Sequence, residues 1–163
     1  MYAGIRTLTA LITAAVALAP AASPAQETTG LVMASRGDVT VVAEGEERPL
    51  RQGDFLHERD EIRVSDRSFA VLQFVDSAKV TLRPDSTLVI ERYGYTGSDE
   101  DTATLRLQAG GMRVKAGMIA SSQPLNFQIR TPLSLLSISG PEGSLTLCDE
   151  DICELEGLAY IQE

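Results

Sequence analysis

The apolar residues of this chain recur at every second position, and this period constrains the fold more than any other feature. Short alternating or β-branched runs are separated by Gly, Pro, Asp and Ser about every ten residues. Beyond residue 25, no segment keeps apolar residues at helical spacing for three turns without such a break. The runs expected to form strands are 39–42, 62–64, 69–75, 80–83, 88–93, 103–108, 112–116, 127–131, 133–138, 144–147 and 155–161. The pattern predicts an all-β fold, a single compact domain of short strands, and leaves a β-sandwich, a roll and a short β-solenoid open.

The run 69–75 differs from the others because it is apolar at nearly every position. Such runs are typical of strands that are covered on both faces, so we expect both faces of this strand to be buried. Aromatic residues are few and Trp is absent. The core must therefore consist mainly of Val, Leu and Ile.

The amino-terminal segment has the three parts of a secretory signal peptide. Arg6 is the only charged residue before Glu27, and it precedes an apolar stretch at 8–19 that is followed by Pro20 and small residues. This stretch of 12 residues is short against the roughly 20 that a membrane-spanning helix needs. We therefore expect a cleaved leader and an exported protein, periplasmic or secreted, in preference to an uncleaved membrane anchor.

Small residues mark the expected cleavage site. Ser23 and Ala25 favour cleavage before Gln26, and cleavage after Ala21 is the alternative. The expected organisation is then a signal peptide at 1–25, a flexible lead at 26–30 and a β domain at 31–163.

The charge balance of the exported part excludes some partners. Without Arg6 it carries 13 basic and 23 acidic side chains, a net charge of −10. Such a surface repels phosphate backbones and anionic lipid headgroups, which argues against a nucleic-acid partner. Solubility explains the acidity, with a cationic partner or metal ions as the alternatives.

Cys148 and Cys153 are the only cysteines, and four residues separate them. In an oxidising, exported setting a close pair of this kind predicts a disulfide, here one that staples a hairpin. A zinc site is the alternative, but it needs about four ligands, and the only histidine, His57, is far away in the sequence.

A set of short motifs, in a fixed order, gives the chain a resemblance to a known family. The order is a "G-x-V" strand, an "L-x-x-G-D" turn, a "D-x-I-x-T" strand, a "G-x-A-x-L-x-F-x-D-G-S" hairpin and an "L-x-P-x-S" corner. These correspond to 37–39, 50–54, 60–64, 68–80 and 82–88, and the segments 105–107, 110–114 and 127–132 fit a second half. The chain resembles the FecR domain family over about 31–163. The motif residues have structural roles. Gly53 permits positive φ, and the Asp54 carboxylate can accept hydrogen bonds from the amides of the turn. Pro84 forces a corner, and Asp76-Ser77 forms a turn where relatives more often carry Asp-Gly.

The chain also departs from the family pattern. The usual "R-G-T-x-F" is replaced at 139–145, and the cysteine pair follows it. The resemblance implies that sigma-factor regulators of this family have a cytoplasmic segment, a membrane helix and a receptor-binding part around the domain. Since we see none of these here, we expect a stand-alone periplasmic FecR-like domain whose partner is an unknown envelope protein, such as a sensor or receptor.

We find no residues that indicate catalysis, a cofactor or a metal. His57 lies in a polar turn, where we expect it to pair with Glu58 or Asp60, and no nucleophile, zincin or phosphate-loop motif is present. The acidic clusters Asp99-Glu100-Asp101 and Asp149-Glu150-Asp151 lack the ligand spacing and central glycine of calcium loops. We expect solvated loops at both, and we expect no enzyme.

Two functions remain open. The first is a protein-interaction or sensory-scaffold module that uses strand edges or the acidic loop 94–102. The second is a carbohydrate- or cell-wall-binding domain, for which Tyr93, Tyr95 and Tyr160 would be the aromatic platform. The candidate interaction surface is Tyr93, Tyr95, Asp99, Glu100 and Asp101.

Overall fold

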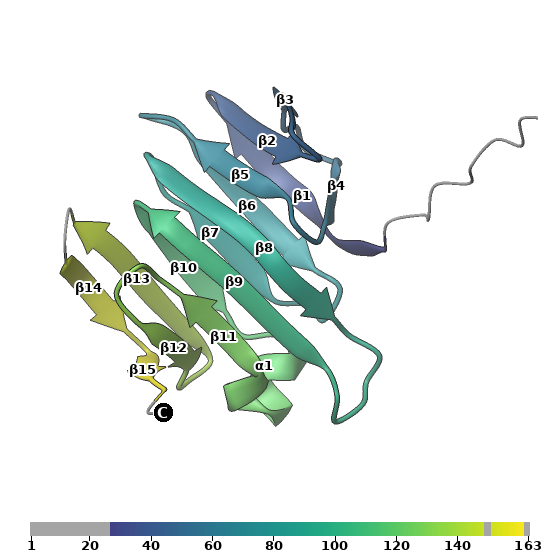
Figure 1. The fold of residues 1–163 in the computed structure, drawn as a ribbon, viewed down its shortest axis with the longest axis vertical. Coiled ribbons are helices and arrows are strands. Elements are labelled where there is room, and N and C mark those ends of the chain that lie inside the picture. The colour runs from purple at the N-terminus through teal and green to yellow at the C-terminus, as the bar shows by residue number, and fades with distance from the viewer. Residues whose placement is uncertain (1–26, 149–150, 162–163) are drawn as a thin grey trace, which may run out of the picture.

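The computed structural model describes residues 27–148 and 151–161 and contains two β-sheets (Figure 1). The expected signal peptide, both cleavage sites and two members of the second acidic cluster, Asp149 and Glu150, lie outside the described residues. The strands are β1 Thr28–Arg36, β2 Val39–Ala43, β3 Glu46–Pro49, β4 Phe55–His57, β5 Glu61–Val64, β6 Phe69–Phe74, β7 Lys79–Leu82, β8 Ser86–Gly94, β9 Thr102–Ala109, β10 Gly111–Lys115, β11 Phe127–Arg130, β12 Leu135–Ile138, β13 Glu142–Cys148, β14 Asp151–Glu156 and β15 Leu158–Tyr160. Two short helices, α1 Met118–Ser122 and the 3-10 turn η1 Pro124–Asn126, interrupt them. Within these ranges no helix is long and apolar enough to cross a membrane.

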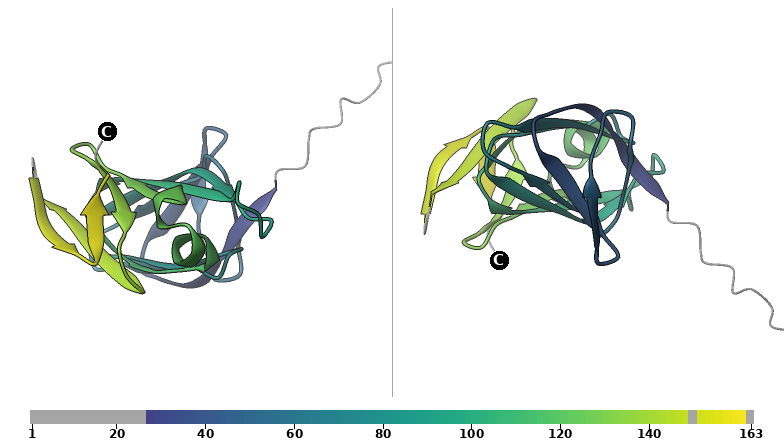
Figure 2. Two further views of the ribbon diagram at one scale, coloured as in Figure 1. Left: turned by 90° about the horizontal axis from the view of Figure 1, so that it is seen from below. Right: turned by 90° about the horizontal axis from the view of Figure 1, so that it is seen from above.

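The chain advances from one end of the molecule to the other while it alternates between the sheets. Sheet A has the order β14-β13-β10-β7-β6-β1-β4, and sheet B has the order β15-β12-β11-β9-β8-β5-β2-β3. Among the registered pairs of the described residues, β9 with β11 is parallel and the others are antiparallel. A parallel solenoid is therefore excluded, and the fold is a sandwich of two sheets, as the end views show (Figure 2).

The core lies between the sheets and is built mainly from Val, Leu and Ile, as expected. Strand alternation produces it, since every second residue of a strand such as β5, β6 or β7 is buried. Phe74 of sheet A stacks on Tyr93 of sheet B with ring centroids 4.2 Å apart, and Phe127 meets Tyr93 edge-on at 6.4 Å. α1 covers one end of the sandwich between the sheets, where Ile119 and Ala120 are buried (Figure 2).

The expected strand 69–75 is covered on one face only. Its residues alternate between buried and accessible, so Phe69 and Val71 point to the outside of sheet A while Ala70 and Leu72 enter the core. The prediction of two buried faces was therefore wrong. Apolar residues do occupy both sets of alternate positions, but no second layer covers the outer set.

Other boundaries also differ from the expected ones. β1 begins at Thr28, so most of the expected lead at 26–30 belongs to a strand that pairs with both β4 and β6. The expected strand 155–161 is two strands, because Gly157 adopts φ 64° and carries the chain from β14 in sheet A to β15 in sheet B. The strands β1, β3 and β4 were not predicted, because their sequences contain few β-branched residues at alternate positions.

Candidate functional site

The first candidate surface, the end of β8 with its loop, is mostly internal. Tyr93 is 4% exposed, and its hydroxyl donates to Oδ1 of Asp76 at 2.6 Å. Burial, and next the charge of Asp76, raise the pKa of Tyr93 far above its ordinary value of 10.0. Tyr95 points the same way, is half-buried and packs against the core. The two tyrosines do share a strand face, as predicted, but it is the inner face, so they cannot form an exposed platform for sugars.

The acidic part of this surface holds its own loop together. The carboxylate of Asp101 is buried and accepts from the backbone amides of Thr96 (2.7 Å), Gly97 (2.8 Å) and Ser98 (3.0 Å). Desolvation opposes ionisation, but these hydrogen bonds outweigh it and lower the pKa of Asp101. Asp99 and Glu100 are exposed, and Asp99 accepts from the side-chain amide of Gln123 at 3.2 Å. Over the described ranges, no three His, Cys, Asp or Glu side chains are placed to hold a metal ion.

A buried carboxylate behind Tyr93 was not predicted. Asp76 is fully buried in the turn between β6 and β7, and it accepts from the amide of Ala78 at 3.0 Å and that of Ile119 at 3.1 Å besides the hydroxyl of Tyr93. Its backbone carbonyl accepts from Met118 at 2.9 Å. Asp76 thus satisfies the first amides of α1 and links three elements, which is a structural role.

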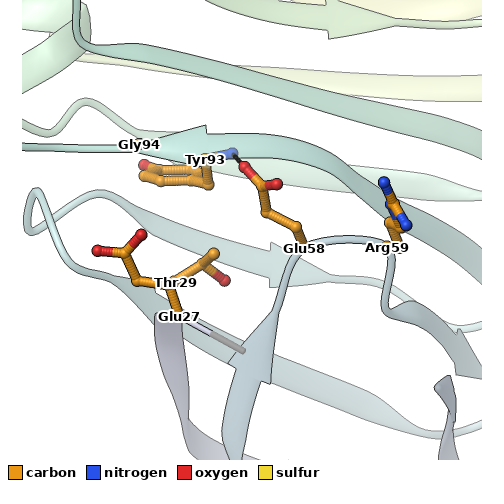
Figure 3. Close-up of a pocket in the computed structure, with 6 residues that line it drawn as sticks. All are labelled: Glu27, Thr29, Glu58, Arg59, Tyr93 and Gly94. Atoms are coloured by element: carbon orange, nitrogen blue, oxygen red, sulfur yellow. Dashed lines mark hydrogen bonds between the residues drawn. The ribbon is translucent and has the colours of Figure 1, made fainter. Parts of the chain in front are cut away.

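A polar hollow lies beside Tyr93 (Figure 3). It has a volume of about 280 Å³ and is lined by Glu27, Thr29, Glu58, Arg59, Tyr93 and Gly94. Glu27 lies directly before β1 and Thr29 near its start, and Glu58 and Arg59 come from the turn after β4. Glu58 is already engaged, since it accepts from the backbone amide of Tyr93 at 2.8 Å (Figure 3). Glu27 is the second carboxylate of the lining.

The outer side of β14 carries a charged network. Arg83 donates two hydrogen bonds to Glu154, at 2.5 and 3.0 Å, and the hydroxyls of Ser144 (2.9 Å) and Thr146 (3.0 Å) donate to the same carboxylate. The hydrogen bonds from Arg83, Ser144 and Thr146 lower the pKa of Glu154 to about 2. These contacts fasten β14 to β13 and β7.

The remaining predicted residues are in structural positions. Cys148 and Cys153 form a disulfide with a Cα–Cα separation of 5.8 Å, which joins β13 to β14 and excludes the zinc alternative. His57 Nδ1 lies 3.8 Å from the carboxylate of Asp60, which is one of the two expected partners. Asp54 accepts from the amide of Arg51 at 2.9 Å after Gly53 at φ 89°, as the turn motif predicted.

The outer faces of the two sheets differ, and this difference marks the best candidate site. On sheet B the charged side chains pair across strands: Arg63 lies 3.5 Å from Glu47, and Glu91 pairs with Arg106 and, at 3.5 Å, with Arg130. On sheet A, adjacent strands β4, β1 and β6 expose apolar side chains. We call Leu31 (36% exposed), Met33 (39%), Phe55 (60%) and Phe69 (37%) the apolar patch.

One row of side chains crosses sheet A from this patch to β13, the neighbour of the edge strand β14. The register pairs successive members directly, and the row reads Phe55, Leu31, Gln73, Lys79, Lys115 and Glu142. The face therefore changes from apolar to basic to acidic along the row. No sequence pattern indicated it, because its members come from six strands and only their register brings them together.

Comparison with known proteins supports the family resemblance. The FecR family model, described as FecR protein, matches residues 60–151, from the turn before β5 to the first residue of β14. The motifs at 37–54 lie outside this match. The comparison with curated proteins gave no match, and the comparison with solved structures gave none either. Since the family match spans more than half of the chain, the chain belongs to the FecR family.

Proposed function

We propose that this chain is a non-catalytic interaction or sensory-scaffold module of the cell envelope, and that it binds a partner protein through the outer face of sheet A. The observation that carries the proposal is the apolar patch on β4, β1 and β6. Within it, Leu31 and Phe55 are directly opposite each other in the register. Exposed apolar side chains that adjoin one another in this way are typical of interaction surfaces, whereas single exposed ones need no explanation.

The contrast between the two faces supports this assignment. Sheet B provides an internal reference, because its outer face is covered by paired charges, as in a solvated sheet. The far half of sheet A is covered in the same way, by the pairs Arg113–Glu142 and Arg83–Glu154. On β1 and β4, by contrast, Leu31 and Phe55 stand directly opposite each other. A partner that covers them removes apolar surface from water, which favours association.

The family and its compartment agree with the proposal. FecR domains are generally non-catalytic signalling or sensor domains that face the periplasm and imply envelope signalling partners. The disulfide is consistent with an oxidising compartment. Carbohydrate binding loses its main support, since Tyr93 and Tyr95 face the core, and Tyr160, which is 58% exposed, lies on the edge strand β15.

Co-purification with matched surface variants tests the proposal. The full chain, tagged at its carboxyl end, should recover a stoichiometric protein from periplasmic extract. The double variant Leu31→Ser with Phe55→Ser should lose that protein. Leu125→Ser removes a leucine of η1 that is more exposed than Leu31 and lies outside the patch, and this variant should retain the protein. Retention by the double variant, or pelleting of the chain with purified peptidoglycan in place of a protein, would overturn the proposal.

A further inference from the structure

We infer that Lys79 and Lys115 make the outer face of sheet A selective for an acidic protein partner. The inference rests on the proposed function and names the chemistry of the partner. Lys79 and Lys115 are the only lysines in the chain, and the register of β7 and β10 places them directly opposite each other. Both are exposed and alternate with buried Val80 and Val114, so both point away from the core.

This pair is unfavourable in the isolated chain. Like charges directly opposite each other destabilise a pair of strands. No carboxylate within the described ranges lies within 4.0 Å of either lysine. Glu142 stands opposite Lys115 in the register, but its carboxylate accepts from Arg113 at 2.6 Å. The lysines therefore form an unneutralised positive site on an otherwise acidic domain.

The same row fixes how this site relates to the apolar patch. Leu31 and Lys79 are separated by one strand, β6, so they stand about 10 Å apart at the usual strand spacing of about 4.8 Å. A partner that covers the patch and presents carboxylates about 10–15 Å away would neutralise the lysines as it buries the apolar residues.

A second copy of the chain does not provide this match. A two-fold axis that runs across the strands, between two facing A sheets, places lysine pair on lysine pair. A two-fold axis that runs along the strands can place the apolar patch of one copy on that of the other, or the lysines of one copy on the acidic β13–β14 edge of the other. It cannot do both at once, because the patch, the lysines and the acidic edge lie at different places along the row.

The test uses charge reversal of one lysine and a matched reversal on the other sheet. Lys79→Glu and Arg92→Glu change the net charge equally, and Arg92 is exposed on β8 of sheet B. The probe is a fluorescent random copolymer of glutamate and tyrosine, which offers carboxylates and apolar groups together. Lys79→Glu should weaken its binding by about tenfold, whereas Arg92→Glu should weaken it less than about twofold. Equal losses would overturn the inference, as would tighter binding of phosphatidylglycerol vesicles than of the copolymer.

Stability gives an independent readout that rules out misfolding. Lys79→Glu replaces a like-charge pair by a Glu–Lys pair with Lys115, so its urea midpoint should equal or exceed that of the wild type while its binding falls. A lower urea midpoint would contradict the claim that the two lysines repel each other in the folded protein. If the partner recovered by co-purification depends on Leu31 and Phe55 but not on Lys79, the inference fails and the proposed function stands. If it depends on none of them, both fail.

Discussion

The hydroxyl of Tyr93 donates a 2.6 Å hydrogen bond to the buried carboxylate of Asp76 and thereby joins β8 of sheet B to the β6–β7 turn of sheet A. The same carboxylate accepts from Ile119 at the start of α1. One turn residue thus positions both sheets and the helix that covers the end of the sandwich. This connection explains why the tyrosine that looked suited to ligand binding is part of the core.

Removal of the Tyr93 hydroxyl should destabilise the domain. Tyr93→Phe keeps the ring stacked on Phe74 but leaves one buried oxygen of Asp76 with fewer donors, which costs about 1–3 kcal/mol. Urea unfolding measures this free energy. The control is Tyr95→Phe, whose hydroxyl makes no hydrogen bond within the described ranges and which should change stability by less than about 0.5 kcal/mol. Equal effects of the two variants would show that the bond to Asp76 contributes nothing.

Alkaline pH should destabilise the domain through the same residue. Burial and the neighbouring Asp76 raise the pKa of Tyr93 in the folded state, so folded Tyr93 keeps its proton where an unfolded tyrosine, with a pKa of 10.0, releases it. The contribution of protonated Tyr93 to the free energy of unfolding is complete below pH 10.0. Above that value it is lost at about 1.4 kcal/mol per pH unit. Urea midpoints at about pH 9 and about pH 11 should show this loss, and Tyr93→Phe should reduce it. A wild-type slope that the substitution leaves unchanged would contradict the assignment.

A methyl group at Gly117 should disrupt the centre around Asp76. A Cβ there would lie less than 3.0 Å from Oδ2 of Asp76 and from the amide nitrogen of Ala78. Gly117→Ala should therefore cost about 1–3 kcal/mol in the free energy of unfolding. Gly94→Ala is the matched control, because a Cβ at Gly94 has no atom within 4 Å, and its unfolding free energy should stay within about 0.5 kcal/mol of the wild type.

Acid should loosen the edge strand β14 through Glu154. Hydrogen bonds from Arg83, Ser144 and Thr146 lower the pKa of Glu154 from 4.5 to about 2. Its contribution to stability is therefore present above pH 4.5 and is lost as the pH falls toward about 2. Amide exchange of β14 should accelerate over this window in the wild type. Glu154→Gln should exchange faster already at neutral pH and depend less on pH, and parallel profiles for the two proteins would refute the role of Glu154.

Local chemistry made much of the scaffold predictable. Period-two runs located strands such as β5 and β8, and Gly53-Asp54 indicated a turn that the structure contains. The spacing of Cys148 and Cys153 indicated their disulfide. Each of these features depends on residues that are close in the sequence.

The candidate site was not predictable because it depends on distant pairing. Tyr93 and Tyr95 could be assigned to one face of a strand, but sequence does not say which face meets the other sheet. Likewise, Lys79 and Lys115 lie 36 positions apart in the numbering and become neighbours only through the register of β7 with β10. Sequence alone gives no such register, and so the gradient across sheet A was missed.

Site-specific photo-crosslinking in living cells tests the central claim, that sheet A carries the partner-binding face. A benzophenone side chain at Phe55, within the apolar patch, should form a covalent adduct with a single protein on irradiation. The same group at Gln108, which is exposed on the outer face of β9 in sheet B, should form none. Adducts of equal yield at both positions, or an adduct at Gln108 alone, would contradict the assignment of the outer face of sheet A.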